Sequence, residues 1–242
     1  MGLCNIFALG PGERVFAQGS SILLTLKPFT IRADGIKDER QARAYLAEVA
    51  GIIRSIEATS TIGKTLISAI CGYKNPVLVF PLIKAYDADD DTPYAWVSTR
   101  CGLFPVVMSY SPLFGQRLRK HLGGDPQNFE HSFTPHEVFV HELVHVARAS
   151  SGNFDRMGDD EEDLAVMIAN MFSVEMNRPP IKSYDEMAPI KKGDVAAFTR
   201  TFCDDHAEMI GTFCQQNRDL AVQLSYAKTA FNPLRMYIDE NL

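Results

Sequence analysis

The chain has 242 residues, of which 46% are hydrophobic and 22% are charged, and its formal net charge is −6. This is the composition of an ordinary globular protein with enough apolar residues for a sizeable core. The acidic balance argues against nucleic acid or an anionic membrane surface as the main partner, because both favour basic patches. No apolar stretch has the length of a transmembrane segment.

The first residues, MGLCNIFALGPGERVF, do not resemble a cleavable signal peptide. They lack a charged region, a long apolar region and a cleavage site with small residues. The five cysteines form an odd, irregularly spaced set, which favours reduced thiols in a protein made in the cytosol. If the protein is exported, we expect a route that does not use a standard signal peptide.

Secondary-structure signals divide the chain into three parts, which we expect to form one domain. Residues 1–35 contain short apolar pieces between glycines and prolines, which indicates an N-terminal extension of strands and turns. Residues 36–185 are the expected core, and residues 186–242 read as amphipathic helices. Within the core, the first helices are expected at 38–56 and 61–70, and strands at 76–82, 94–98 and 103–110. This order predicts an α+β fold.

A helix with clear signals at both ends follows these strands. Thr134 suits the N-cap, Pro135 suits the first helical position, and Glu137 completes a capping box. Gly152 suits the C-terminal cap, so the helix is expected to end at Ser150 or Ser151. A further helix is expected over Glu161–Met176, before a pair of prolines.

The capped helix contains the sequence HELVH at residues 141–145. Residues four apart lie on one face of an α-helix, so His141 and His145 can bind one metal ion. Zinc accepts imidazole nitrogens and, in catalytic sites, usually has three protein ligands and a water. Glu142 is placed to accept a proton from that water, whose pKa zinc lowers to about 7. The motif therefore predicts a Zn²⁺-dependent hydrolase acting on a protein or peptide substrate.

A third ligand is expected from the next helix, which opens with Glu161, Glu162 and Asp163. Acidic residues at a helix N-terminus also stabilise the helix dipole, so the residues alone leave the choice among the three open. The following helix is nevertheless the best place to look for a carboxylate ligand, because HExxH supplies only two of the three protein ligands, both histidines.

The stretches HELVHVARASSG and EEDLAV resemble zincin-type effector and toxin metallopeptidases of bacteria. This group includes the NleD-like effectors, the C-terminal peptidase domain of VgrG-type secreted proteins and the botulinum neurotoxin light chains. The resemblance implies that Glu162 is the third zinc ligand and that Glu161 orients a histidine. Residues 170–184 and 55–64 are similar to further segments of bacterial toxin zincins. The first of these implies that Tyr184 donates a hydrogen bond to the transition state.

The resemblance also implies an architecture and a biological setting. The expected fold is a small mixed sheet with the HExxH helix and C-terminal helices, and the expected protein is a secreted endopeptidase. It would leave a bacterial cytoplasm through a specialised secretion system, with a secretion-system, chaperone or immunity protein as a partner. In such folds the substrate lies along an edge strand before the motif helix, and Leu103–Tyr110 is the expected strand.

Two other interpretations stay open. A zincin scaffold can act by binding a target protein without proteolysis, although a binding protein has no need for Glu142. A non-catalytic helical adaptor would use its acidic surface and would hold no stoichiometric metal.

Overall fold

The computed structural model describes residues 14–18, 21–81, 95–100, 103–111, 134–154, 159–183 and 188–241. In these ranges the chain is a mixed α+β protein. The strands are β1 (Arg14–Gln18), β2 (Ser21–Leu26), β3 (Phe29–Arg32), β4 (Val77–Pro81), β5 (Ala95–Arg100) and β6 (Leu103–Tyr110). The helices are α1 (Glu39–Thr59), α2 (Thr61–Gly72), α5 (Pro135–Ser151), α6 (Asp159–Glu175), the short 3-10 helix η2 (Lys192–Asp194), α7 (Val195–Asp205), α8 (Ala207–Gln216), α9 (Arg218–Ser225) and α10 (Pro233–Asn241).

The described strands form one mixed sheet in the order β1-β2-β3-β4-β6-β5. The first three strands pair antiparallel, β4 pairs in parallel with both β3 and β6, and β5 pairs antiparallel with β6. A parallel pair needs a crossover connection, and α1 and α2 provide it between β3 and β4. The segment expected as an N-terminal extension therefore supplies three strands to the common sheet.

The prediction that Leu103–Tyr110 is an edge strand is wrong. This strand, β6, lies between β4 and β5, so both of its sides are paired. The edge strands of the described sheet are β1 and β5, and β5 pairs antiparallel with β6. Alternating apolar residues identify a strand, but they do not say which neighbours it pairs with.

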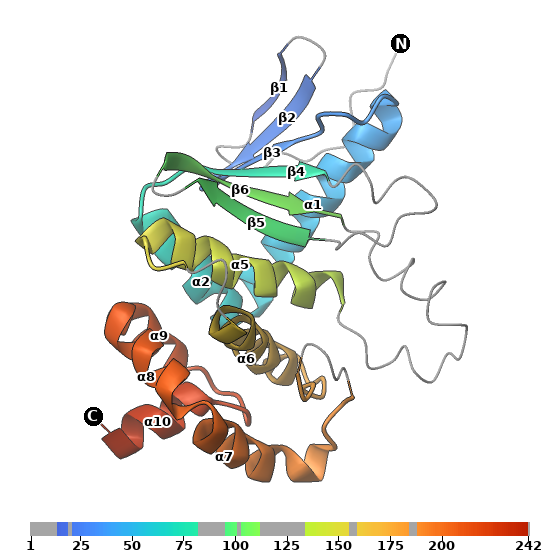
Figure 1. Ribbon diagram of the computed structural model, residues 1–242. Helices are drawn as coiled ribbons and strands as arrows, with labels where there is room; N and C mark the ends of the chain where they lie inside the picture. Colours follow the sequence, from blue (N-terminus) through green and yellow to red (C-terminus); the bar gives the residue numbers. More distant parts are fainter. Residues whose placement is uncertain are drawn as a thin grey trace.

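Alternation of buried residues explains how the sheet packs on the helices. In β3, β4 and β6 every second side chain is buried, at Phe29, Ile31, Val77, Val79, Val106, Met108 and Tyr110. Figure 1 shows α5 between the sheet and α6, with α7 to α10 on the far side of α6. Phe139 of α5 packs edge-on against Tyr110 with ring centroids 5.0 Å apart. The Tyr110 hydroxyl donates to the Pro135 carbonyl at 2.8 Å, which fixes the start of α5 on the sheet.

The predicted ends of the motif helix are confirmed. The Thr134 side chain accepts from the backbone N–H of Glu137, and the Glu137 carboxylate accepts from the N–H of Thr134. Gly152 has φ 81°, a left-handed conformation that glycine adopts without steric cost. The next helix, α6, begins two residues before the expected Glu161 and ends at Glu175.

A close contact between α1 and α2 gives a prediction about stability. A Cβ atom on Gly63 would lie 2.1 Å from the Ile56 Cγ2 atom and 3.0 Å from its carbonyl oxygen. Overpacking of this kind costs about 1–3 kcal/mol, and only part is offset by the helix propensity of alanine, about 1 kcal/mol. Gly63→Ala should therefore lower the free energy of unfolding in urea.

Gly51→Ala on α1 is the matched control, because no atom lies within 4 Å of a Cβ placed there. Helix propensity acts there without a clash, so this variant should gain up to about 1 kcal/mol. Equal shifts of the two urea midpoints in one direction would show that the Gly63 contact has no energetic consequence.

No helix in the described ranges is both long enough and apolar enough to cross a membrane.

Candidate metal centre

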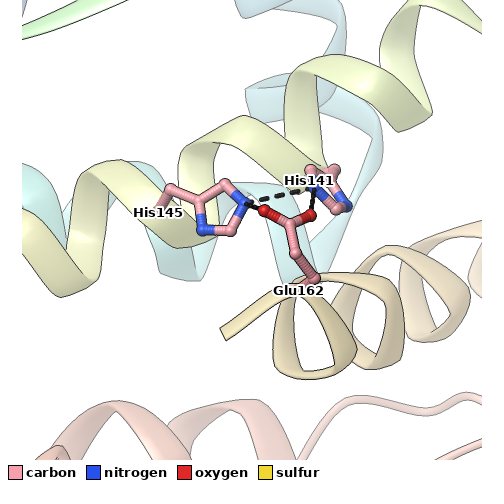
Figure 2. A group of neighbouring side chains, drawn as sticks. All are labelled: His141, His145 and Glu162. Atoms are coloured by element: carbon pink, nitrogen blue, oxygen red, sulfur yellow. Dashed lines mark hydrogen bonds and ion pairs between the residues drawn. The ribbon is translucent and has the colours of Figure 1, made fainter. Parts of the chain in front are cut away.

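Three side chains meet between helices α5 and α6. His141 and His145 project from α5, and Glu162 projects toward them from the first turn of α6 (Figure 2). The two histidine Nε2 atoms lie 3.2 Å apart. Glu162 Oε2 lies 3.1 Å from Nε2 of His141, and Glu162 Oε1 lies 3.5 Å from Nε2 of His145. Two imidazoles and a carboxylate converge here in an arrangement that could hold a metal ion.

A separate set of bonds joins α5 to the end of α6 that lies away from Glu162. One turn before His141, the buried Glu137 carboxylate accepts from Ser173 Oγ at 2.6 Å and from Arg178 Nε at 2.8 Å. These bonds join the start of α5 to the end of α6 and the residues after it. Glu137 thus has a second function beyond its capping box, and that function was not visible in the sequence.

Exposure differs across the group. The side chains of His141 and His145 are only 7% and 5% exposed, whereas that of Glu162 is 54% exposed. The centre is therefore enclosed on the α5 side and accessible to solvent on the side of Glu162. A molecule from solution can approach it from that side.

The Glu142 carboxyl is buried next to this group. Burial raises its pKa to about 7; the charge of His145 opposes the rise and that of Glu162 adds to it. Its Oε2 atom has no hydrogen-bond partner among the described residues. A buried carboxyl oxygen without a partner is unfavourable, and a water or a substrate group would satisfy it.

The carboxylates favour positive charge at the point where the imidazoles meet. Burial lowers the pKa of His141, and the bond to Glu162 opposes this. Burial also acts to lower the pKa of His145, but bonds to Glu161 and Glu162 outweigh it and raise that pKa to about 9. The bonds to both histidines hold the pKa of Glu162 well below its usual range. A bound cation would meet the same attraction as a proton.

Glu161 contacts the other nitrogen of His145. Its Oε1 lies 3.3 Å from His145 Nδ1, and its Oε2 accepts from Arg148 Nε at 3.1 Å. The structure thus places Glu161 on a histidine, where the resemblance had implied it. Arg148 was not identified from the sequence, although its position three residues after His145 puts both on one side of the helix.

The remaining candidates lie apart from this group or cannot be placed. Tyr184 lies outside the described residues. Asp163 is 3.6 Å from His206, which stacks on the Phe202 ring, and neither of the pair belongs to the metal-binding group. His136 on α5 does not belong to it either.

Comparison with known proteins found no matching family model, no matching curated protein and no matching solved structure. A proposal for function therefore depends on the geometry of the metal-binding group and on the HExxH motif at residues 141–145.

Proposed function

We propose that the protein is a zinc-dependent endopeptidase of the zincin type. His141, His145 and Glu162 bind the metal, and Glu142 is the general base. The observation that carries this proposal is the meeting of the two HExxH histidines with a carboxylate from the next helix. The buried Glu142 oxygen beside them, which has no hydrogen-bond partner in the described ranges, supports the second assignment.

The spacing of the donor atoms supports zinc as the metal. A tetrahedral site with bonds of about 2.0–2.1 Å has donor atoms about 3.3–3.4 Å apart. The two histidine Nε2 atoms are 3.2 Å apart, close to this value, and one oxygen of Glu162 faces each of them, at 3.1 and 3.5 Å. Octahedral coordination at about 2.0–2.1 Å, as magnesium requires, gives about 2.8–3.0 Å, and magnesium prefers oxygen to imidazole.

The residues of the site have separate tasks in amide hydrolysis. Zinc would supply a Lewis acid that polarises the peptide carbonyl and acidifies a water molecule. Glu142 accepts the proton of the attacking water and delivers it to the leaving amine nitrogen. His141, His145 and Glu162 hold the metal from two helices, so the open side near Glu162 is left for the substrate.

The sheet offers a place for the peptide chain. Of the two edge strands of the described sheet, β1 and β5, it is β5 that packs against α5. An extended peptide can add to an edge strand through backbone hydrogen bonds, which makes β5 the proposed substrate strand in place of β6. The proposed setting, a bacterial effector or toxin exported by a specialised secretion system, follows from the resemblance alone.

A cleavage survey tests the peptidase proposal. Purified protein is incubated with a peptide library made from a proteome, and the new N-termini are identified by mass spectrometry. We expect cleavage that a zinc chelator abolishes and that added zinc restores. A protein that binds zinc but yields no new N-termini would instead favour the alternative, in which the scaffold binds a target protein without proteolysis.

A further inference from the structure

The C-terminal end of α5 connects the metal centre to the C-terminal helices. Arg148 is buried there, with only 7% of the residue exposed. Its Nε donates to Glu161 Oε2 at 3.1 Å, and its Nη1 donates to Gln216 Oε1 at 2.7 Å. Gln216 is the last residue of α8. One guanidinium group therefore joins α5, α6 and α8.

Glu161 has a different partner on each of its carboxylate oxygens. One oxygen faces Nδ1 of His145 and the other accepts from Arg148. Because Nε2 of His145 faces His141 and Glu162, a metal at that point needs the ring proton on Nδ1. A carboxylate that accepts from Nδ1 fixes this tautomer and the orientation of the ring.

Glu161 needs a cation to stay in this position. Its side chain is only 4% exposed, and a buried carboxylate is unfavourable unless it is paired. Arg148 pairs with it, and it remains the cationic partner when a metal on Nε2 keeps the His145 ring neutral. The guanidinium is planar with donors in fixed directions, so the bond to Gln216 also fixes the direction of the Nε–H that points to Glu161.

Other bonds hold α8 and α9 against the same end of α5. The Ser151 hydroxyl donates to Asn217 Oδ1 at 3.0 Å, and the Asn153 amide donates to the Gln216 carbonyl at 3.2 Å. Gln216 is therefore held by its backbone as well as by its side chain, which makes it a firm support for Arg148.

We propose that Arg148, held by Gln216, is a positioning residue for the metal centre. It keeps Glu161 against His145 and thereby increases the affinity for the metal. The inference rests on the proposed metal site of His141, His145 and Glu162, but not on any particular substrate. It assigns the C-terminal helices a part in metal binding, since α8 supplies Gln216.

The test compares the zinc affinity of the wild-type protein with that of two variants. Arg148→Met removes the hydrogen bonds to Glu161 and Gln216 and keeps much of the aliphatic part of the side chain. Gln216→Leu removes only the hydrogen bond from Arg148 to Gln216. Affinity is measured by competition with a chromogenic chelator, and the visible spectrum of the cobalt(II)-loaded protein reports ligand geometry. We expect Arg148→Met to weaken zinc binding by about 10–100-fold and to alter the cobalt bands, as loss of a group that orients a ligand does. Gln216→Leu should have a smaller effect in the same direction.

Arg178→Met is the matched control. Arg178 also donates its Nε to a buried glutamate of α5, but Glu137 is not in the metal-binding group. Thermal unfolding of the metal-free proteins is measured beside each affinity. We expect the control to lose thermal stability without a change in zinc affinity or in the cobalt spectrum.

The outcomes separate this inference from the proposed function. Wild-type zinc affinity and cobalt bands in Arg148→Met overturn the inference, as does an equal loss of affinity in the Arg178→Met control. If Arg148→Met does not fold, wild-type affinity in Gln216→Leu overturns it instead. A wild-type protein that binds no zinc removes the proposed function and the inference together. Weaker zinc binding in the Arg148 and Gln216 variants, without any peptide cleavage by wild type, supports the inference and removes only the peptidase.

Discussion

Replacing Glu142 by glutamine is expected to lower kcat for peptide hydrolysis by about 10²–10⁴-fold, the usual contribution of a general base. An amide has nearly the shape of the carboxylate but cannot accept the proton of the attacking water. Because Glu142 does not belong to the metal-binding group, zinc should stay bound. Burial already raises the pKa of this carboxyl to about 7, so a neutral side chain should not reduce stability.

Rates and zinc content of Glu142→Gln should be measured on the same preparation. Glu57→Gln, an exposed carboxylate on α1, is the control and should keep the wild-type rate. Unchanged kcat in Glu142→Gln would show that another group removes the proton. Zinc lost together with the rate would mean that the residue supports the metal rather than the chemistry.

His145→Ala is expected to weaken zinc binding by about 10²–10³-fold. Structural zinc sites with four ligands bind with about 10–16 kcal/mol, or about 2.5–4 kcal/mol for each ligand. His145 is one of the three proposed donors, and its Nε2 faces both His141 and Glu162. The measurement is chelator competition with purified protein at neutral pH.

His136→Ala provides the comparison for this variant. His136 lies on the same helix but outside the metal-binding group, so its loss should leave the affinity unchanged. Equal affinities in wild type and His145→Ala would mean that zinc binds elsewhere or not at all.

Features set by neighbouring residues could be predicted from the sequence. The caps at Thr134 and Gly152 depend on contacts within a few residues, and the structure has them as expected. The same holds for the spacing of His141 and His145, which a helix brings to one face. The approach of a carboxylate from the next helix needed only one further step, since a short connection links that helix to α5. The residues alone left the choice among Glu161, Glu162 and Asp163 open.

Features set by distant parts of the chain could not be predicted from the sequence. Strand order in the sheet depends on which surfaces pack together, and for that reason Leu103–Tyr110 was wrongly expected at the edge. Gln216 lies 68 residues after Arg148, and no local pattern joins them. The bond between Glu137 and Arg178 spans 41 residues and is equally hidden. In each case tertiary packing decides the partner.

The metal content of protein purified without added metal tests the central claim most directly. Elemental analysis of the wild-type chain should find close to one zinc per chain, because one group of three donors is present in the described residues. The double variant His141→Ala, His145→Ala should hold almost none while keeping the circular dichroism spectrum of the wild type. A wild-type chain without stoichiometric zinc, or a double variant that retains it, would contradict a zinc site at these residues.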